Sequence, residues 1–298
     1  MMDDRQRERA ALGVHLSVSG QRGRILEDGF SEHGYVLDIG GAEQSHVDAA
    51  DATVVFYEYL RRIANVLDVL APPREPVTAL HLGAGALTLA RYVQATRPGS
   101  SQVAVDYEPQ LMGFVTEVLP LPAGTRCEFV VADARAVLPE IPALFGAHAA
   151  SDGGVFRGID AIILDIFTGM DAPAHLANAG YYAELRELLS ARGVLAVNVG
   201  DDAGLPFFQG QARALLDTFE HVWCLCDSSM LSGEHEGNLV LIATARELDE
   251  DTADALFARG PHPAEVLGTE ELRDFWGTWP SNSCPRRPPQ NRPGTQAA

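Results

Sequence analysis

The chain has 298 residues, of which 46% are hydrophobic, and a formal net charge of −19. A chain of this length and composition can bury a substantial core, so we expect a globular protein, either one large domain or a domain with a small appendage. The negative charge disfavours nucleic acid as a partner, because binding to phosphate backbones draws its affinity from Lys and Arg.

The sequence predicts a cytoplasmic protein without a membrane partner. Its longest apolar runs are about 8 residues, well short of the roughly 20 that cross a bilayer, and charges occupy the first twenty positions, where a signal peptide needs an apolar block. The four cysteines are too few and too scattered for a disulfide framework. The nine histidines form no i, i+4 pair and no Cys/His cluster, so we expect no metal site.

The first part of the chain predicts a small β module over residues 12–50, because short β-type runs at residues 15–18, 23–26 and 35–37 are separated by Gly and Ser. A helix is predicted next, over residues 53–70, where apolar residues recur at spacings of three and four.

From residue 78 the pattern alternates between strand and helix. We expect strands at residues 78–82, 102–106, 127–131, 159–165 and 193–199, and helices at residues 87–96, 109–118, 134–144, 178–190 and 206–219. Parallel strands with crossover helices on both faces are the expected packing. Two further strands, at residues 222–226 and 238–244, should pair antiparallel at one edge.

This order of elements predicts an α/β fold over residues 51–245, with a doubly wound, mostly parallel, seven-stranded sheet. The arrangement resembles the Rossmann-like fold of class I methyltransferases. Residues 246–280 are expected to form a helical extension, and a loop is suggested at residues 147–154. The proline-rich residues 281–298 are expected to be disordered.

Two glycines end the strand at residues 78–82 and indicate a nucleoside site. Gly83 allows a tight turn and Gly85 allows close approach of the backbone to a ligand. Asp106 ends the next strand, where a carboxylate can accept both ribose hydroxyls. Asp133 and the backbone of Ala134 follow the third strand and could hold an adenine, in line with Gly83 and Asp106. The alternative is that Asp133 caps the following helix, the commoner role of a lone Asp at a strand end.

Asp165 ends the fourth strand and is the candidate catalytic residue, because a carboxylate there could orient an incoming nucleophile and take its proton. Capping or bracing of the next loop is the alternative role. Asp160, at the start of that strand, is expected to be solvated, and His81 to be buried and hydrogen-bonded. Asn198, at the end of the fifth strand, could face the same cleft.

Several short segments together resemble the spermidine synthase-like, or polyamine aminopropyltransferase, family over roughly residues 20–245. The matching residues are Leu37-Asp38 with Gln44, Phe56-Tyr57-Glu58-Tyr59, Asp106, Asp133-Ala134, Asp165 and Tyr181-Tyr182. The resemblance implies that Gln44 contacts the nucleoside and that Tyr57 and Tyr181 line an amine pocket. It also implies decarboxylated S-adenosylmethionine as donor, a small-molecule amine as acceptor and a homodimer.

The chain departs from the family pattern at two acidic positions. Ala86 stands where the family's Gly-Gly-Gly-Asp-Gly turn has Asp, and Thr168 stands where the Asp-Ser-Ser-Asp-Pro loop has its second Asp. Asp171 could substitute for that second Asp if the loop is remodelled. Loss of two carboxylates would leave the charges of a doubly cationic amine poorly paired.

Three functions are therefore open from the sequence. The first is aminopropyl transfer from decarboxylated S-adenosylmethionine to an amine, with Asp165 as the catalytic group. The second is methyl transfer from S-adenosylmethionine to a small molecule, because Ala86 could make room for the methionine carboxylate. The third is nucleoside binding without catalysis.

Overall fold

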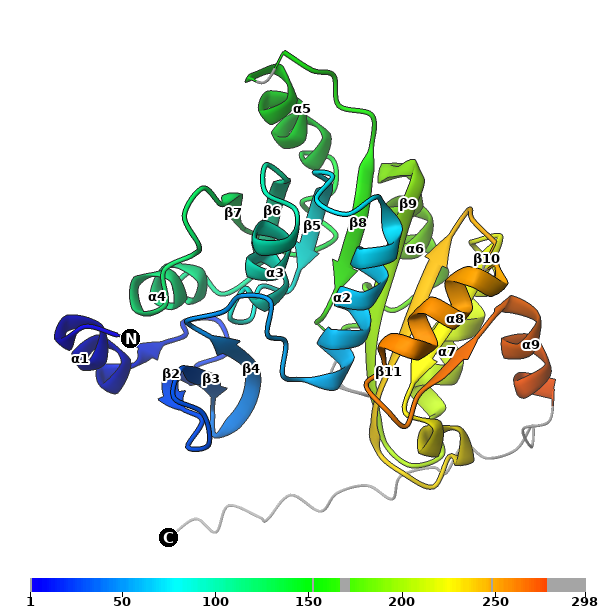
Figure 1. Ribbon diagram of the computed structural model, residues 1–298, viewed down its shortest axis with the longest axis horizontal. Helices are drawn as coiled ribbons and strands as arrows, with labels where there is room; N and C mark the ends of the chain where they lie inside the picture. Colours follow the sequence, from blue (N-terminus) through cyan, green and yellow to red (C-terminus); the bar gives the residue numbers. More distant parts are fainter. Residues whose placement is uncertain (1, 152, 167–171, 248, 278–298) are drawn as a thin grey trace, which may run out of the picture.

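The computed structural model describes residues 2–151, 153–166, 172–247 and 249–277 (Figure 1). The chain begins with helix α1 (Asp4–Leu12), which Asp3 caps by accepting a hydrogen bond from the Gln6 amide. A small antiparallel sheet follows, with the strand order β1-β2-β3-β4. Its strands are β1 (Val14–His15), β2 (Arg22–Glu27), β3 (Gly34–Ile39) and β4 (Ala42–Asp48).

A second, larger sheet forms the centre of the molecule. Its strands are β5 (Thr78–Leu82), β6 (Ser101–Asp106), β7 (Arg126–Val131), β8 (Ile159–Leu164), β9 (Leu189–Asp201), β10 (His221–Cys226), β11 (Gly237–Thr244) and β12 (Glu265–Leu267). Their order is β12-β10-β11-β9-β8-β5-β6-β7. The pairs from β9 to β7 are parallel, while β11 runs antiparallel to both β9 and β10.

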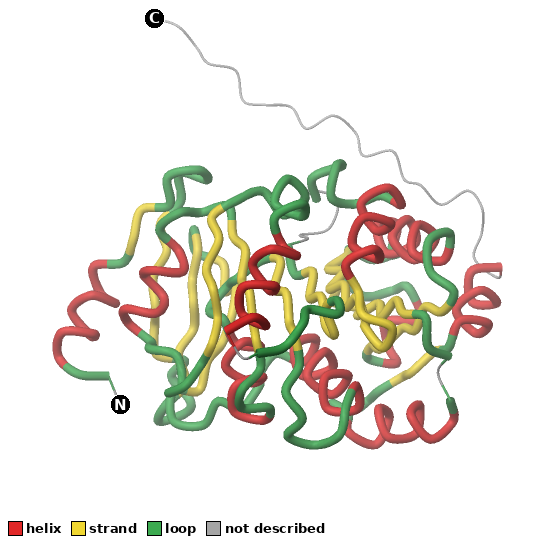
Figure 2. Tube along the Cα trace, turned by 90° about the horizontal axis from the view of Figure 1, so that it is seen from above, coloured by secondary structure: helices red, strands yellow, loops and turns green. Residues whose placement is uncertain are grey.

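Helices cover both faces of this sheet (Figure 2). They are α2 (Glu58–Leu70), α3 (Thr88–Thr96), α4 (Leu111–Val118), α5 (Ile141–Ser151), α6 (Ala179–Leu188), α7 (Pro206–Leu216), α8 (Glu250–Arg259) and α9 (Thr269–Gly277), with a 3₁₀ helix at Ser228–Ser232. Side chains of α2, α3 and α8 fill one core layer, and side chains of α5, α6 and α7 fill the other. A third layer joins α4 to the small sheet.

The predicted α/β fold, with a mostly parallel sheet and a small N-terminal antiparallel sheet, is confirmed. Successive side chains of a strand point to opposite faces of the sheet, so one strand of the large sheet can contribute to both core layers. In β8, Ala161 and Ile163 face the layer of α2, whereas Ile162 and Leu164 face the layer of α6. Two strands were not predicted: β4, in the small sheet, and β12, which pairs antiparallel with β10 at the edge of the large sheet.

The helix predicted over residues 134–144 is displaced along the chain. Residues 134–140 form turns, and α5 begins at Ile141 and extends to Ser151, through part of the predicted loop. Pro139 and Pro142 explain the shift, because proline is excluded from a helix interior and tolerated in the first turn, where Pro142 lies. The helix predicted from residue 53 likewise begins later, at Glu58.

The expectation of a solvated Asp160 is wrong. Its side chain is buried, and it accepts hydrogen bonds from the Thr78 amide (3.0 Å), Ser190 Oγ (2.9 Å) and Arg192 Nε (3.0 Å). These partners belong to β5 and β9, the two strands beside β8. Asp160 therefore ties three neighbouring strands together at their N-terminal side.

Candidate active site

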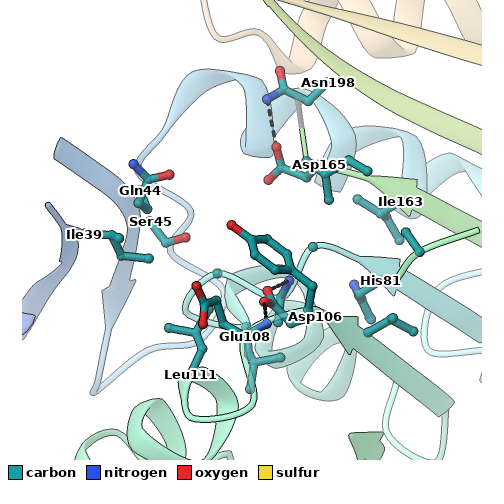
Figure 3. A pocket seen from close by; sticks show the side chains of 18 of the residues that line it. Ile39, Gln44, Ser45, His81, Asp106, Glu108, Leu111, Ile163, Asp165 and Asn198 are labelled. Carbon is teal, nitrogen blue, oxygen red and sulfur yellow. Dashed lines mark hydrogen bonds between the residues drawn. The ribbon is translucent and has the colours of Figure 1, made fainter. Parts of the chain in front are cut away.

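A cavity of about 910 Å³ opens at the carboxyl ends of β5, β6 and β8 (Figure 3). Residues of β4 and the start of α2 close its other side, so the cavity lies between the two sheets. The volume falls within the range of small-molecule sites, and the position is the one at which open parallel sheets bind ligands.

The glycine turn forms the floor of this cavity. Gly83 has φ 92° and Gly85 has φ 48°. A Cβ atom on Gly83 would lie 2.3 Å from the Asp165 carbonyl oxygen, and one on Gly85 would lie 2.4 Å from Ser45 Oγ. Both positions therefore require glycine, for conformation and for space. The turn leads directly into α3.

Asp106 lies beside this turn at the end of β6. One carboxylate oxygen accepts from the Ala84 amide (3.1 Å) and the other from the Glu108 amide (2.9 Å). Burial raises the pKa of Asp106, although these backbone hydrogen bonds oppose the change. The carboxylate is thus held rigidly, with lone pairs left to face the cavity.

Asp133 and Ala134 line the cavity beyond the end of β7. Asp133 accepts from the amides of Arg135 and Ala136, each at 3.0 Å, and its second oxygen lies 2.8 Å from His175 Nε2. Burial acts to raise the pKa of Asp133, but the hydrogen bonds from His175 and the two amides outweigh it and lower the pKa. Asp133 therefore caps the turns of residues 134–140 from within the cavity wall.

Asp165 follows β8 and also lines the cavity. Its carboxylate accepts from Asn198 Nδ2 (2.8 Å) and, at a longer 3.4 Å, from the Tyr59 hydroxyl. Asn198 in turn accepts from Asn238 Nδ2 (3.0 Å), so β8, β9 and β11 all contribute to the position of this group. Enclosure by protein raises the pKa of Asp165, and the two hydrogen bonds reduce that rise.

The wall opposite Asp165 comes from β4 and from the residues that precede and begin α2. Gln44 and Tyr57 both line the cavity, and the Tyr57 hydroxyl donates to Glu43 Oε2 at 3.0 Å. The rings of Tyr57 and Tyr59 stack, with centroids 6.3 Å apart and an interplanar angle of 20°. Burial, followed by the neighbouring Glu43, raises the pKa of Tyr57, so its hydroxyl stays protonated.

One predicted acceptor residue, Tyr181, is placed differently. Tyr181 is fully buried behind the wall, where its hydroxyl donates to the Ala134 carbonyl (3.3 Å), and it is not among the residues that line the cavity. Thr168 and Asp171 lie outside the described residues. Ala86 is buried, and its amide donates to Ser45 Oγ at 3.2 Å.

The other predicted site residues come together at one cavity: Gln44, Tyr57, Gly83, Gly85, Asp106, Asp133, Ala134 and Asp165. Asn198 faces it as predicted, and His81 is buried and hydrogen-bonded to Gln102 (2.9 Å), with burial lowering its pKa to about 4. Sequence reasoning missed Glu43, Ser45 and Glu108. Glu108 accepts from the Val18 and Ser19 amides, about ninety positions away, and local sequence carries no signal for such a contact.

The described residues contain no group of three or more His, Cys, Asp or Glu side chains placed to hold a metal ion. Across the same ranges, no helix combines the length and apolar character that crossing a bilayer requires.

Comparison with known proteins identifies the relatives of this chain, although no family model matches it. A polyamine aminopropyltransferase of Neisseria meningitidis serogroup A is 26% identical over 261 residues, which cover 86% of this chain and 90% of that protein. A polyamine aminopropyltransferase of Chromobacterium violaceum is 28% identical over 195 residues, 64% of this chain and 67% of that protein.

Solved structures show the same fold. A probable spermidine synthase from Corynebacterium glutamicum superposes with a TM-score of 0.74 at 24% identity, covering 87% of this chain and 91% of that one. A spermidine synthase from Thermotoga maritima gives a TM-score of 0.54 at 15% identity, covering 86% and 84%. The fold thus defines an α/β protein of the methyltransferase-like class. Within that class the chain is similar in sequence to polyamine aminopropyltransferases, the family that its motifs resemble.

Proposed function

We propose that this protein is a transferase that moves an aminopropyl group from decarboxylated S-adenosylmethionine to an amine. Asp165 carries the proposal: an enclosed carboxylate, fixed by Asn198 and Tyr59, which lines the same cavity as the glycine turn and Asp106. The names of the curated relatives support the reaction type, and a spermidine synthase solved with the transition-state analogue AdoDATO shares the fold at a TM-score of 0.56.

The charge of the cavity supports a decarboxylated donor. Among its described lining residues are five acids, Glu43, Asp106, Glu108, Asp133 and Asp165, and neither Lys nor Arg. A donor with a sulfonium and an ammonium is attracted by such a wall, whereas a methionine carboxylate would find no cation there. Methyl transfer from S-adenosylmethionine is therefore the second candidate. Ala86 favours it, because Ala86 stands where the resembling family has an acid and could leave room for the methionine carboxylate.

We assign the nucleoside of the donor to the glycine turn and the strand ends beside it. In this proposal the Gly83 and Gly85 backbone lies against the nucleoside, Asp106 accepts the ribose hydroxyls, and Asp133 with Ala134 holds the adenine. Gln44 contacts the nucleoside from the opposite wall, and Tyr57 lines the acceptor side. For adenine to reach Asp133, His175 must share or release its hydrogen bond to that carboxylate.

The proposed reaction is a single displacement at carbon. The lone pair of a neutral amine attacks the propyl carbon next to the sulfonium, the carbon–sulfur bond breaks, and its electron pair stays on sulfur as methylthioadenosine leaves. The new secondary ammonium then gives a proton to Asp165, and the pKa raised by enclosure makes that carboxylate a better acceptor. Positioning contributes most, since a sulfonium is already a good leaving group.

The test is product formation by purified protein given butane-1,4-diamine and either donor. We expect methylthioadenosine from decarboxylated S-adenosylmethionine, and an Asp165→Asn variant should lose about 100-fold or more of that rate, the lower end of a general-base effect. Asp217→Asn, an exposed aspartate at the end of α7, is the matched control and should retain the rate.

Two results would reject the proposal in different ways. Formation of S-adenosylhomocysteine from S-adenosylmethionine would indicate methyl transfer instead. No product from either donor across common diamines and polyamines, with Asp165→Asn indistinguishable from wild type, would indicate a nucleoside-binding protein without catalysis.

We further propose that the protein acts on small molecules in the cytoplasm as a homodimer. The dimer rests on the family resemblance. The exclusion of nucleic acid and of an anionic membrane surface as partners rests on the charge of −19, which repels phosphate groups.

A further inference from the structure

The five acids of the cavity fall into two groups by their hydrogen-bond donors. Three are held by backbone amides: Asp106 by Ala84 and Glu108, Glu108 by Val18 and Ser19, and Asp133 by Arg135 and Ala136. The other two, Asp165 and Glu43, accept from side chains in the described structure. In the described structure, these two carboxylates accept hydrogen bonds from side chains and therefore do not fix the course of the backbone.

Two tyrosines connect these two carboxylates along the cavity wall. Glu43 accepts from the Tyr57 hydroxyl at 3.0 Å, and the Tyr57 ring stacks on the Tyr59 ring. The Tyr59 hydroxyl points to Asp165 at 3.4 Å. The wall thus carries a negative charge at each end and two aromatic faces between them, and all four residues line the cavity.

We propose that Glu43 binds the distal ammonium of a linear diamine or polyamine acceptor whose attacked nitrogen lies at Asp165. This inference rests on the proposed function and assigns the acceptor's second charge to a residue of β4. Methylene groups of the acceptor lie along the tyrosine rings, whose faces also attract ammonium groups. Tyr57 is a positioning residue, because its hydroxyl orients Glu43.

A diamine carries two positive charges, so a carboxylate other than Asp165 is needed to pair the charge on the nitrogen that is not attacked. Glu43 supplies that carboxylate from a different element. Its exposed side chain reaches the cavity from β4, close to the β3–β4 turn.

Binding of two amines of matched length tests this assignment without requiring turnover. Calorimetry on protein saturated with methylthioadenosine would compare butane-1,4-diamine with butylamine. We expect wild type to prefer the diamine by up to about fivefold, as an ion pair with an exposed carboxylate would provide. Glu43→Gln should lose this preference by weakening the diamine and leaving butylamine unchanged, and Tyr57→Phe should lose less.

Glu27→Gln is the matched control, because Glu27 is an exposed glutamate of the same small sheet that does not line the cavity. Equal thermal melting of the variants would exclude a folding defect as the cause. Equal affinity of wild type for the two amines, no binding of either, or the same loss for both amines in Glu43→Gln would overturn the assignment.

Calorimetry with decarboxylated S-adenosylmethionine distinguishes whether Glu43 binds the ammonium of the donor or that of the acceptor. If Glu43→Gln weakens decarboxylated S-adenosylmethionine and spares the diamine, Glu43 serves the donor ammonium and the proposal is wrong. The binding arms stay decisive even if wild type forms no methylthioadenosine, a result that would reject the transfer reaction and not the diamine site.

Discussion

At the scale of single residues, Asp160 and Asp165 lie at opposite ends of one strand and have opposite electrostatic behaviour. Burial acts to raise the pKa of both. At Asp160 the hydrogen bonds from Arg192, Thr78 and Ser190 outweigh burial, so its pKa is lowered. At Asp165 the neutral side chains Asn198 and Tyr59 do not offset it, so its pKa is raised. One aspartate is thereby fixed as a structural anion, and the other is able to exchange a proton.

This contrast predicts the effect of removing the Asn198 amide. Asn198→Ala deletes a hydrogen bond that stabilises the Asp165 carboxylate, so the pKa of Asp165 should rise further. The acid limb of the pH–rate profile should move to higher pH, and the rate at neutral pH should fall. Tyr59→Phe, which removes a longer 3.4 Å contact, should produce a smaller displacement. An acid limb at the same pH in Asn198→Ala and wild type would show that Asn198 does not set the pKa of the group that takes the proton.

At the scale of elements, the sequence reveals most where periodicity reflects burial. Strand β8 and helix α2 were both predicted, β8 from its apolar run and α2 from its helical spacing of apolar residues. Both elements have side chains in the core beside the large sheet. β4 was not predicted because its first half, Ala42 to Gln44, is exposed and includes the polar residues Glu43 and Gln44. Asp160 was misjudged because its partners come from β5 and β9, and their proximity is created by the fold.

The same limit applies to the candidate site. Residues at strand ends, such as Asp106 and Asp165, were predictable because parallel strands bring their carboxyl ends to one edge. Glu43 and Glu108 were not, since each depends on how the small sheet packs against the large one. Tyr181 matched a sequence pattern, yet the structure buries it behind the cavity wall.

Asp160→Asn tests how β5, β8 and β9 are joined. At pH 7 the variant should lose about 1–3 kcal/mol in free energy of unfolding, as expected for breaking a buried, charge-assisted network. Because the pKa of Asp160 is lowered by folding, its contribution is full above the unfolded pKa of about 3.9 and is lost as pH falls through the folded value. Urea unfolding should therefore show the difference in unfolding free energy from wild type to be constant above about pH 4 and to shrink below it. A difference that stays constant below about pH 4 would contradict this prediction.

At the scale of the whole molecule, the charge of −19 acts on any cationic ligand before it reaches the cavity. Screening shortens that attraction, since the Debye length falls from about 10 Å at 0.1 M salt to about 3 Å at 1 M. We expect kcat/KM for butane-1,4-diamine to fall several-fold over this range, and more steeply than for butylamine. The affinity for methylthioadenosine, which is uncharged, is the control and should change little. Equal salt dependence for the two amines would count against steering by net charge.

The small sheet is fastened to the glycine turn at several points. Ser45 Oγ accepts from the Ala86 amide, Thr88 Oγ1 donates to the His46 carbonyl, and Glu108 holds the turn between β1 and β2. The outer wall of the cavity therefore belongs to a hairpin whose turn, Gly40-Gly41, is open to solvent. In the proposed assignment, Glu43 of this hairpin faces the acceptor, whereas Gln44 beside it contacts the donor nucleoside. Amine specificity is therefore expected to change by substitution at Glu43 and in the turn, with Gln44 and the strand ends around Asp106 kept.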